Sequence, residues 1–284
     1  MIRPMRQPDA PEVLALLEWM DEQPEREVFA PEARDLDDLR LESEDKRCWV
    51  AEDDLGQVRA YCALAPHPHG LVLEGPLGEA RLPAMLTQAV REAQGQGVYA
   101  FCARDNEPVH AVLAAAGFTV MHGTDFYRLR RGEARGLTAL PPGLLLRLRT
   151  DLSTYQRLYR AAEDGWSERL GWSEADFQAH LMRDDRCLLV LMRGEAALGF
   201  VELELGETAE LAYFAVHPAE RGQGLGRVLL SAAIREAFAR PEVQALRVRA
   251  HDHEDGARAL YAHMGFTACR SVMTYLYPGD DGEV

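Results

Sequence analysis

The sequence predicts an α+β fold made of two tandem copies of one domain, each a mixed, largely antiparallel sheet flanked by helices. Two observations support this fold class. Strand-like and helix-like segments follow one another in the same order in both halves. Landmarks also recur at matching spacing: Cys48 and Leu64 are as far apart as Cys187 and Leu203, and each half ends on a Gly-Phe pair. Agreement in order across several elements indicates a repeat rather than chance.

Periodicity and breaking residues define the elements of the first half. Pro4 suggests an edge strand, Pro8 opens a helix with an apolar side, and a polar turn at 53–57 predicts a hairpin. The expected elements are a strand at 2–6, a helix after Pro8, short helix and loop over 21–45, hairpin strands at 48–52 and 59–64, a strand at 70–74, a helix at 82–93, a strand at 98–102, a helix at 109–116 and a strand at 125–129.

A stretch rich in Gly and Pro at 132–143 is typical of a linker. After it the same order begins again, which predicts a first domain at 1–131 and a second at 144–284. The expected elements of the second are a strand at 144–149, a helix at 153–162, hairpin strands at 186–191 and 198–203, a strand at 210–216 and a helix that stops before Pro241.

Composition restricts the class of protein. The chain of 284 residues is 47% hydrophobic and 27% charged, which is typical of a soluble globular protein. We expect no membrane span, no export signal and a cytoplasmic location. The net charge of −15 argues against a nucleic-acid partner and suits a cationic or amine substrate, although acidity also serves solubility alone. The five cysteines show no metal-ligand spacing, so we expect reduced thiols and no metal.

The stretch from Glu210 to Leu230 carries the strongest chemical signal. A predicted strand enters the glycine-rich turn Arg221-Gly-Gln-Gly-Leu-Gly226, and an apolar-periodic helix follows. Such a turn exposes several backbone N–H groups at the positive end of a helix dipole, which favours a phosphate. No Gly-Lys-Ser/Thr follows, so the turn is not a P-loop, and the spacing is not that of a dinucleotide fingerprint. A tight turn with no ligand is the alternative.

Three segments resemble the GCN5-related N-acetyltransferase (GNAT) superfamily. The turn is similar to its R/Q-x-x-G-x-G/A motif, the preceding Ala209 to Pro218 to its fourth strand, and Ala257-Arg-Ala-Leu-Tyr-Ala-His-Met-Gly-Phe266 to its A-x-x-L-Y-x-x-x-G-F segment. The resemblance covers residues 144–277. It implies acetyl-CoA as cosubstrate and a fifth strand followed by a helix in the segment 257–266. Together with the repeat, these motifs, which only the second half carries, predict tandem domains of which the second is catalytic.

The resemblance also implies residue roles. Tyr261 matches the acid that protonates the leaving thiolate, and Glu210 matches a base that acts on the amine. Glu254 stands where many members have an asparagine that holds the pantetheine arm, which puts that contact in doubt. The implied coenzyme-binding residues are Phe214, Ala215 and Val216 for the arm and thioester, Arg221, Gly222, Gln223, Gly224, Leu225, Gly226 and Arg227 for the pyrophosphate, and Glu254, Ala257 and Arg258.

Each role has an alternative. Tyr261 could simply pack in the core, and Glu210 could be a solvated strand residue. Glu202 and Glu204 share one face of the neighbouring strand, where they could act as the base, bind a cationic substrate, or line a wet sheet face. The first half lacks the glycine turn and has Leu113 at the position of Tyr261, so we expect a degenerate copy. Three roles are open for it: to support the active domain, to close over its substrate, or to bind coenzyme without catalysis.

The sequence thus predicts acetyl transfer to a primary amine of a small molecule, by direct attack in a ternary complex. This chemistry needs a deprotonated amine, a stabilised oxyanion and a protonated thiolate, and it requires no covalent enzyme intermediate. We expect a monomer or homodimer. The alternatives are a non-catalytic acyl-CoA-binding sensor or assembly module, and an enzyme that uses a different acyl donor.

Overall fold

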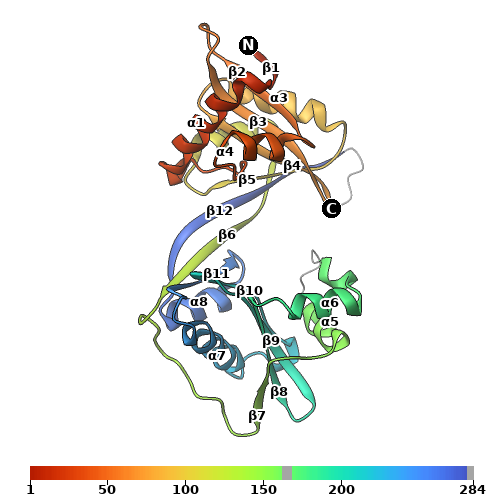
Figure 1. The fold of residues 1–284 in the computed structure, drawn as a ribbon, viewed down its shortest axis with the longest axis vertical. Coiled ribbons are helices and arrows are strands. Elements are labelled where there is room, and N and C mark those ends of the chain that lie inside the picture. The colour runs from red at the N-terminus through yellow and green to blue at the C-terminus, as the bar shows by residue number, and fades with distance from the viewer. Residues whose placement is uncertain (162–167, 280–284) are drawn as a thin grey trace. The chain divides into compact units, whose positions relative to one another are not determined.

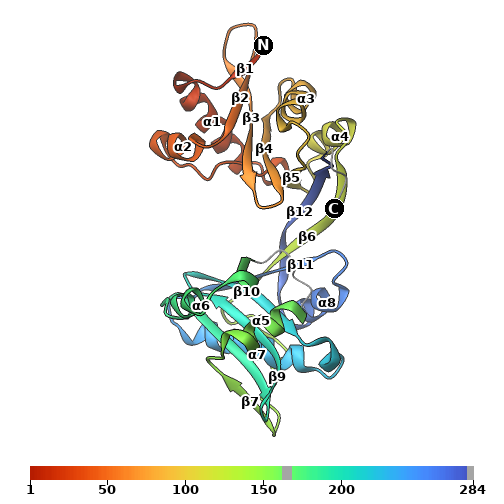
Figure 2. The ribbon, with the colours of Figure 1, turned by 90° about the vertical axis from the view of Figure 1, so that its right-hand side faces the viewer.

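The structure is a computed structural model that describes residues 1–161 and 168–279. Its chain forms two compact units (Figures 1 and 2). The first unit contains residues 1–124 and the chain from Arg270 onward, and the second contains Asp125–Cys269. Residue 162, the expected end of a helix, and residues 280–284 of the expected second domain lie outside the described residues.

The first unit is a mixed sheet with the strand order β1-β2-β3-β4-β5-β12. Its neighbouring strands pair antiparallel except β4 and β5, which pair parallel. Helices α1 and α2 lie on one side of this sheet and α3 on the other (Figure 2). The elements are β1 Ile2–Pro4, η1 Gln7–Asp9, α1 Ala10–Asp21, η2 Pro24–Arg26, α2 Leu36–Ser43, β2 Arg47–Glu52, β3 Val58–His67, β4 Gly70–Gly78, α3 Leu82–Ala93, β5 Val98–Ala103, α4 Glu107–Ala115, β6 Thr119–Arg130 and, from the end of the chain, β12 Thr267–Tyr277.

The second unit repeats this plan with the strand order β6-β11-β10-β9-β8-β7. Strands β7 to β10 pair antiparallel, and β10 pairs parallel with β11. Helices α7 and α8 lie on one side of the sheet, and α5 and α6 on the other (Figure 1). The elements are β7 Leu144–Arg147, α5 Leu152–Ala161, η3 Glu168–Gly171, α6 Glu174–Leu181, β8 Arg186–Arg193, β9 Ala196–Glu204, β10 Thr208–Val216, η4 Pro218–Glu220, α7 Leu225–Ala239, β11 Ala245–His251 and α8 Asp255–Met264.

Two long strands belong to both units. The first unit ends at Thr124, inside β6, and resumes at Arg270, inside β12. The α+β fold with two similar mixed sheets confirms the predicted fold class. The division differs from the expected 1–131 and 144–284, because the second part of β12 pairs with β5 of the first unit, from Val272 with Ala103 to Tyr277 with Val98. Local periodicity identifies a strand but not its distant partner.

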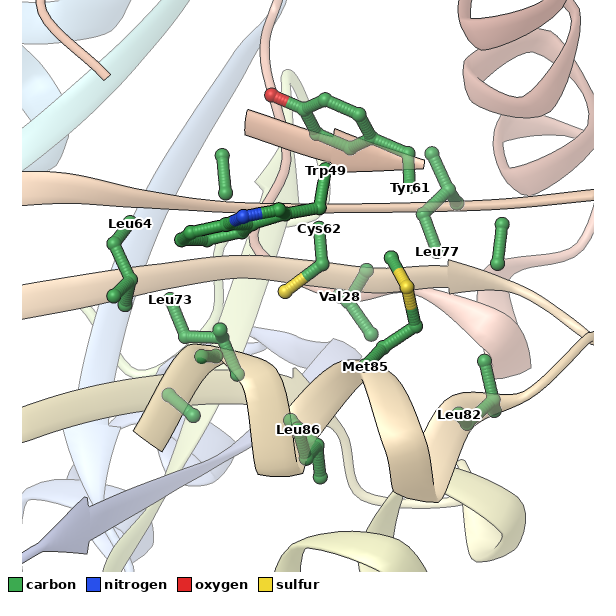
Figure 3. Close-up of a cluster of buried hydrophobic side chains, with 14 of the residues drawn as sticks. Val28, Trp49, Tyr61, Cys62, Leu64, Leu73, Leu77, Leu82, Met85 and Leu86 are labelled. Carbon is green, nitrogen blue, oxygen red and sulfur yellow. The ribbon is translucent and has the colours of Figure 1, made fainter. Parts of the chain in front are cut away.

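The cores follow from the amphipathic patterns. In the first unit, one cluster joins the strands to α1 and α3, and Figure 3 shows part of it around Trp49, Cys62 and Met85. In the second unit, α7 buries the apolar stripe that its sequence predicts, including Leu229 and Ala233, against the sheet. A separate aromatic cluster around Tyr155 and Phe200 fills the α5–α6 side.

Candidate functional site

The sheet of the second unit opens between β10 and β11. Their register contains three residue pairs, from Thr208 with Ala245 to Glu210 with Arg247, whereas β10 runs on to Val216 and β11 to His251. On its other side, β10 stays paired with β9 up to Val216. Within the described residues, the edge of β10 at Phe214–Val216 therefore faces no partner strand. Such an edge offers backbone N–H and C=O groups to an extended ligand.

A bulge in β10 precedes this edge. The β9 register shifts between Leu211 and Tyr213, so Ala212 is the additional residue. Before the bulge, Leu211 packs in the α7–α8 core. After it, Tyr213 packs on the α5–α6 side and Phe214 on the α7–α8 side. A bulge of this kind re-aims the backbone next to a site, and local periodicity carries no signal for it.

The glycine-rich turn leads directly into α7. Gly222 and Gly224 have φ values of +79° and +77°, which L side chains rarely adopt. Gly224 is the N-cap of α7, and no side chain caps the helix there. The N–H groups of the first turn thus remain for another acceptor. Gly226 has an ordinary φ, and an added Cβ would lie 3.5 Å from the Leu260 side chain, which is normal contact.

The side chains expected to bind phosphate already form hydrogen bonds within the protein, except that of Leu225. Arg221 is exposed, and its Nε donates to the Val216 carbonyl at 3.2 Å. Gln223 is also exposed and donates to Glu220 at 3.2 Å. Arg227 donates to the Gly136 carbonyl at 2.7 Å. Leu225 is buried in the core, so its backbone alone is available at the turn.

The expected linker docks against α7. Besides the Arg227–Gly136 bond, the Thr138 amide donates to Ser231 Oγ at 3.1 Å, and Arg235 donates to the Thr138 carbonyl at 2.8 Å. These bonds hold residues 136–138 beside the first turns of the helix. The composition of this segment predicted a connection and did not indicate that it lies against the phosphate-binding helix.

Tyr261 lies in the core beneath the opening. Its side chain belongs to the α7–α8 cluster, is 3% exposed, and its ring lies 6.4 Å from that of Phe214. Burial, followed by the charges of Glu254 and Tyr127, raises the pKa of its phenol well above the usual 10. The described residues provide no hydrogen-bond partner for its hydroxyl. Tyr261 is therefore a neutral phenol that can donate to a ligand.

Glu210 occupies the last paired position before the opening. Its Oε1 lies 2.7 Å from Arg247 Nη2, and both side chains are about half exposed. Its neighbours Ala209 and Leu211 face the α7–α8 core. Because side chains alternate along a strand, Glu210 faces the opposite side of the sheet from Tyr261. A group in the opening would have one of these residues on each side.

Glu202 is not part of a wet sheet face, as one alternative supposed. It is 1% exposed, and Arg169 binds both of its oxygens at 2.7 Å. Tyr155 Oη donates to it at 3.0 Å, and His180 Nε2 lies 2.8 Å away. Burial alone would raise the pKa of Glu202, but the bond from His180 and the charge of Arg169 outweigh it and lower the pKa. This enclosed carboxylate fixes η3 and α6 to the sheet.

Glu204 remains accessible, in contrast to Glu202. It is 43% exposed and pairs with Arg186. It also lies opposite Glu210 in the β9–β10 register. The two accessible carboxylates are therefore neighbours at the same end of the opening.

The expected residues on α8 have partners within the protein. Glu254 accepts a bond from the His251 amide at 2.7 Å. Arg258 lies 3.1 Å from Asp125 and donates to Tyr127 Oη at 3.3 Å, which ties α8 to β6. Ala257 is half-buried against the core. Sequence reasoning missed Arg169, His180 and the docked segment, because each acts through contacts between distant parts of the chain.

Two further properties concern the chain as a whole. No group of three potential metal ligands occurs among residues 1–161 and 168–279. None of the helices described there has both the length and the apolar character to cross a membrane.

Comparisons with known proteins show which sequences part of this chain resembles. Residues 152–266 match the model of the Acetyltransferase (GNAT) family. A mycothiol acetyltransferase of Streptomyces scabiei is 38% identical over 86 residues, which are 30% of this chain and 26% of that protein. The match thus spans about a quarter of that relative's length.

Solved structures show the same fold over nearly the whole chain. A GCN5-related N-acetyltransferase from Sphaerobacter thermophilus has a TM-score of 0.72 at 15% identity, covering 98% of this chain and 96% of its own. A tandem GNAT protein from the clavulanic acid biosynthesis pathway has a TM-score of 0.62 at 16% identity, covering 98% of both chains. Residues 152–266, which contain the opening, the turn and Tyr261, are a GNAT-family domain within a chain that has the fold of tandem GNAT proteins.

Proposed function

We propose that this protein is an N-acetyltransferase that transfers acetyl from acetyl-CoA to a primary amine of a small molecule, and that the second unit carries the reaction. One observation supports the proposal most: the edge of β10 at Phe214–Val216, which pairs with no strand on this side in the described residues, leads into an uncapped helix start, and the Tyr261 ring lies 6.4 Å from that of Phe214. An acyl-CoA needs these three features, for its arm, its pyrophosphate and its thiolate.

The residues fit acetyl-CoA as a substrate. The extended pantetheine arm would pair with the backbone of Phe214–Val216, as an added strand does. The pyrophosphate would accept bonds from the amides of Gly222 to Arg227, with Arg221 as the exposed cation. Arg227 and Arg258 are held by protein partners, so we assign them to positioning the turn and α8.

The reaction consists of direct attack. The amine nitrogen bonds to the thioester carbonyl carbon after its proton has passed to Glu210, directly or through water. The backbone N–H groups of β10 stabilise the oxyanion. The C–S bond then breaks, and the sulfur takes the proton of Tyr261. The pairing of Glu210 with Arg247 leaves room for this role, because half-exposed ion pairs are weak and open readily.

An amine-panel assay that follows thiol release from acetyl-CoA tests the proposal. Tyr261→Phe and Glu210→Gln should each lower turnover with the accepted amine, whereas Tyr275→Phe, a matched change in the first unit, should not. If Tyr261→Phe were as active as wild type, Tyr261 would not be the general acid. A larger loss in Glu204→Gln than in Glu210→Gln would move the base to Glu204.

Two other outcomes identify the alternatives. Acyl-CoA binding without transfer to any amine would favour a non-catalytic acyl-CoA module. Faster release from a longer or charged acyl-CoA, such as succinyl-CoA, would identify a different donor. The amine substrate of the mycothiol acetyltransferase relative belongs in the panel. It is only one candidate, because the match covers 26% of that relative.

A further inference from the structure

The first unit has the same opening in its sheet, but a segment of its own chain fills it. Strands β4 and β5 pair at three positions, from Leu71 with Val98 to Leu73 with Ala100, and then separate. Residues 27–29 enter there. The Phe29 amide donates to the Phe101 carbonyl at 2.9 Å, and the Ala103 amide donates to the Glu27 carbonyl at 2.8 Å.

The segment also bonds to the other edge of the opening. The Gly75 amide of β4 donates to the Phe29 carbonyl at 2.7 Å, while Val28 forms an antiparallel bridge with Cys102 of β5. The segment therefore joins the two strands that have separated. Their backbone groups at these positions are used within the protein.

The filled position is the counterpart of the proposed acyl-CoA seat. In the second unit, Ala215 of β10 pairs with Phe200 of β9. In the first unit, Leu77 of β4 pairs with Tyr61 of β3. Tyr61 is the counterpart of Phe200, because it follows Cys48 by the same number of residues as Phe200 follows Cys187. The end of β4 at 75–78 thus corresponds to the end of β10 that we assign to the pantetheine arm, and one of its amides already bonds to Phe29.

Side chains fix the segment in place. Val28 is 4% exposed and lies in the same apolar cluster as Cys62, Leu77 and Met85 (Figure 3). Glu27 forms an ion pair with Arg270. Its carbonyl also accepts a 3.3 Å bond from Asn106 Nδ2.

Asn106 stands as far before Phe118 as Glu254 stands before Phe266, so the two residues begin corresponding helices. Asn106 is 2% exposed, and its amide nitrogen bonds to Glu27. Asn106 is the asparagine that the family resemblance would assign to an acyl-CoA arm in the first unit. Its side-chain amide already bonds to the backbone of Glu27.

The phosphate end is also missing in the first unit. The turn before α3 lacks alternating glycines, and Arg81 is its N-cap with a φ of +58°. Pro83 in the first turn of the helix has no N–H to donate. A pyrophosphate would find fewer donors here than at α7.

We propose that residues 27–29 permanently take the place of an acyl-CoA arm in the first unit, so that one chain binds one acyl-CoA, in the second unit only. This inference rests on the proposed function for its ligand. It gives the first unit a role other than coenzyme binding.

Calorimetric titration with acetyl-CoA provides the first test, on the full chain and on Gly224→Val. We expect one molecule per chain, and at least a tenfold weaker affinity in the variant, because valine is strained at the left-handed φ of this residue. A stoichiometry of two, or binding of unchanged affinity at one site per chain in Gly224→Val, would overturn the inference while acyl-CoA binding itself stands.

Hydrogen exchange provides a second test that does not require binding. The amides of Phe29, Gly75 and Ala103 should exchange slowly in the free protein and stay unchanged when acetyl-CoA is added, while those of 222–227 slow down. Fast exchange at the first three, or a change there on addition, would overturn the inference. If the titration shows no binding at all, the proposed function fails, and the exchange of these three amides in the free protein still decides whether the opening is filled.

Discussion

Replacing Arg169 by methionine should destabilise the second unit strongly. Glu202 is enclosed, and Arg169 contacts both of its oxygens at 2.7 Å. Removal of the cation leaves a buried carboxylate with only Tyr155 and His180, and losing one partner of a buried pair costs about 3–5 kcal/mol. Arg169 also lies 4.3 Å above the Tyr213 ring, a contact that methionine keeps only in part.

A neighbouring pair provides the matched control. Arg183 and Asp185 also lie 2.7 Å apart, but their side chains are 54% and 37% exposed. Arg183→Met should therefore cost far less than Arg169→Met, because solvent screens the attraction within an exposed pair. Arg169 also bonds to Tyr155 and lies over the Tyr213 ring, so the difference between the two variants measures burial together with these contacts.

Chemical denaturation of each variant, with thermal melting in parallel, measures the effect. For a chain of this size, about 3–5 kcal/mol corresponds to a Tm lowered by roughly 6–20 °C if the transition is two-state. The double variant Arg169→Met with Glu202→Gln should regain part of this loss, since it removes the unpaired charge.

The pH dependence has a definite sign. The folded pKa of Glu202 is lowered, so its contribution to stability is present above the ordinary pKa of 4.5 and is lost as the pH falls through the folded value. The gap between wild type and Arg169→Met should therefore narrow in acid. A loss at pH 7 no larger than that of Arg183→Met would refute the reasoning that burial makes this pair essential.

Three further predictions concern the site and the shared strands. Tyr261→Phe should lower kcat by about 10²–10⁴ with little change in the KM for acetyl-CoA. Because the pKa of Tyr261 is raised, ionisation of its phenol should not lower wild-type activity near pH 10. Initial rates measured across pH, for wild type and variant, check the loss of kcat and this pH profile. Gly224→Ala should raise the KM for acetyl-CoA by about tenfold because of its left-handed φ, whereas Gly226→Ala, with ordinary contacts and φ, should raise it less and should not lower the Tm. Fragments cut between 131 and 132 should be unfolded separately by circular dichroism, since each lacks a strand of its sheet; a folded fragment 132–284 would contradict this.

Sequence reasoning was successful where the signal is local. The hairpins, the helix from Leu225 and the glycine turn all follow from periodicity and backbone requirements. It was less informative where backbone bonds join distant segments. Residues 27–29 belong to a weakly patterned stretch, and nothing in their composition indicates that they bridge β4 and β5.

The carboxylates illustrate the same limit. The spacing of Glu202 and Glu204 correctly places both on one face of β9. It does not show that Arg169, Tyr155 and His180 enclose the first and leave the second accessible, because those partners come from α5, η3 and α6. Roles that depend on enclosure need the tertiary structure.

The strands shared by the two units affect how the chain can fold as it is made. Residues 270–277, which pair with β5 in the first unit, leave the ribosome only after all of the second unit has been synthesised. Until then the outer edge of β5 is exposed and able to pair with other chains. The first unit is therefore synthesised first and completed last. Pairing of β12 with β5 joins segments far apart in sequence and is slow, so we expect aggregation during expression to occur mainly before this pairing forms.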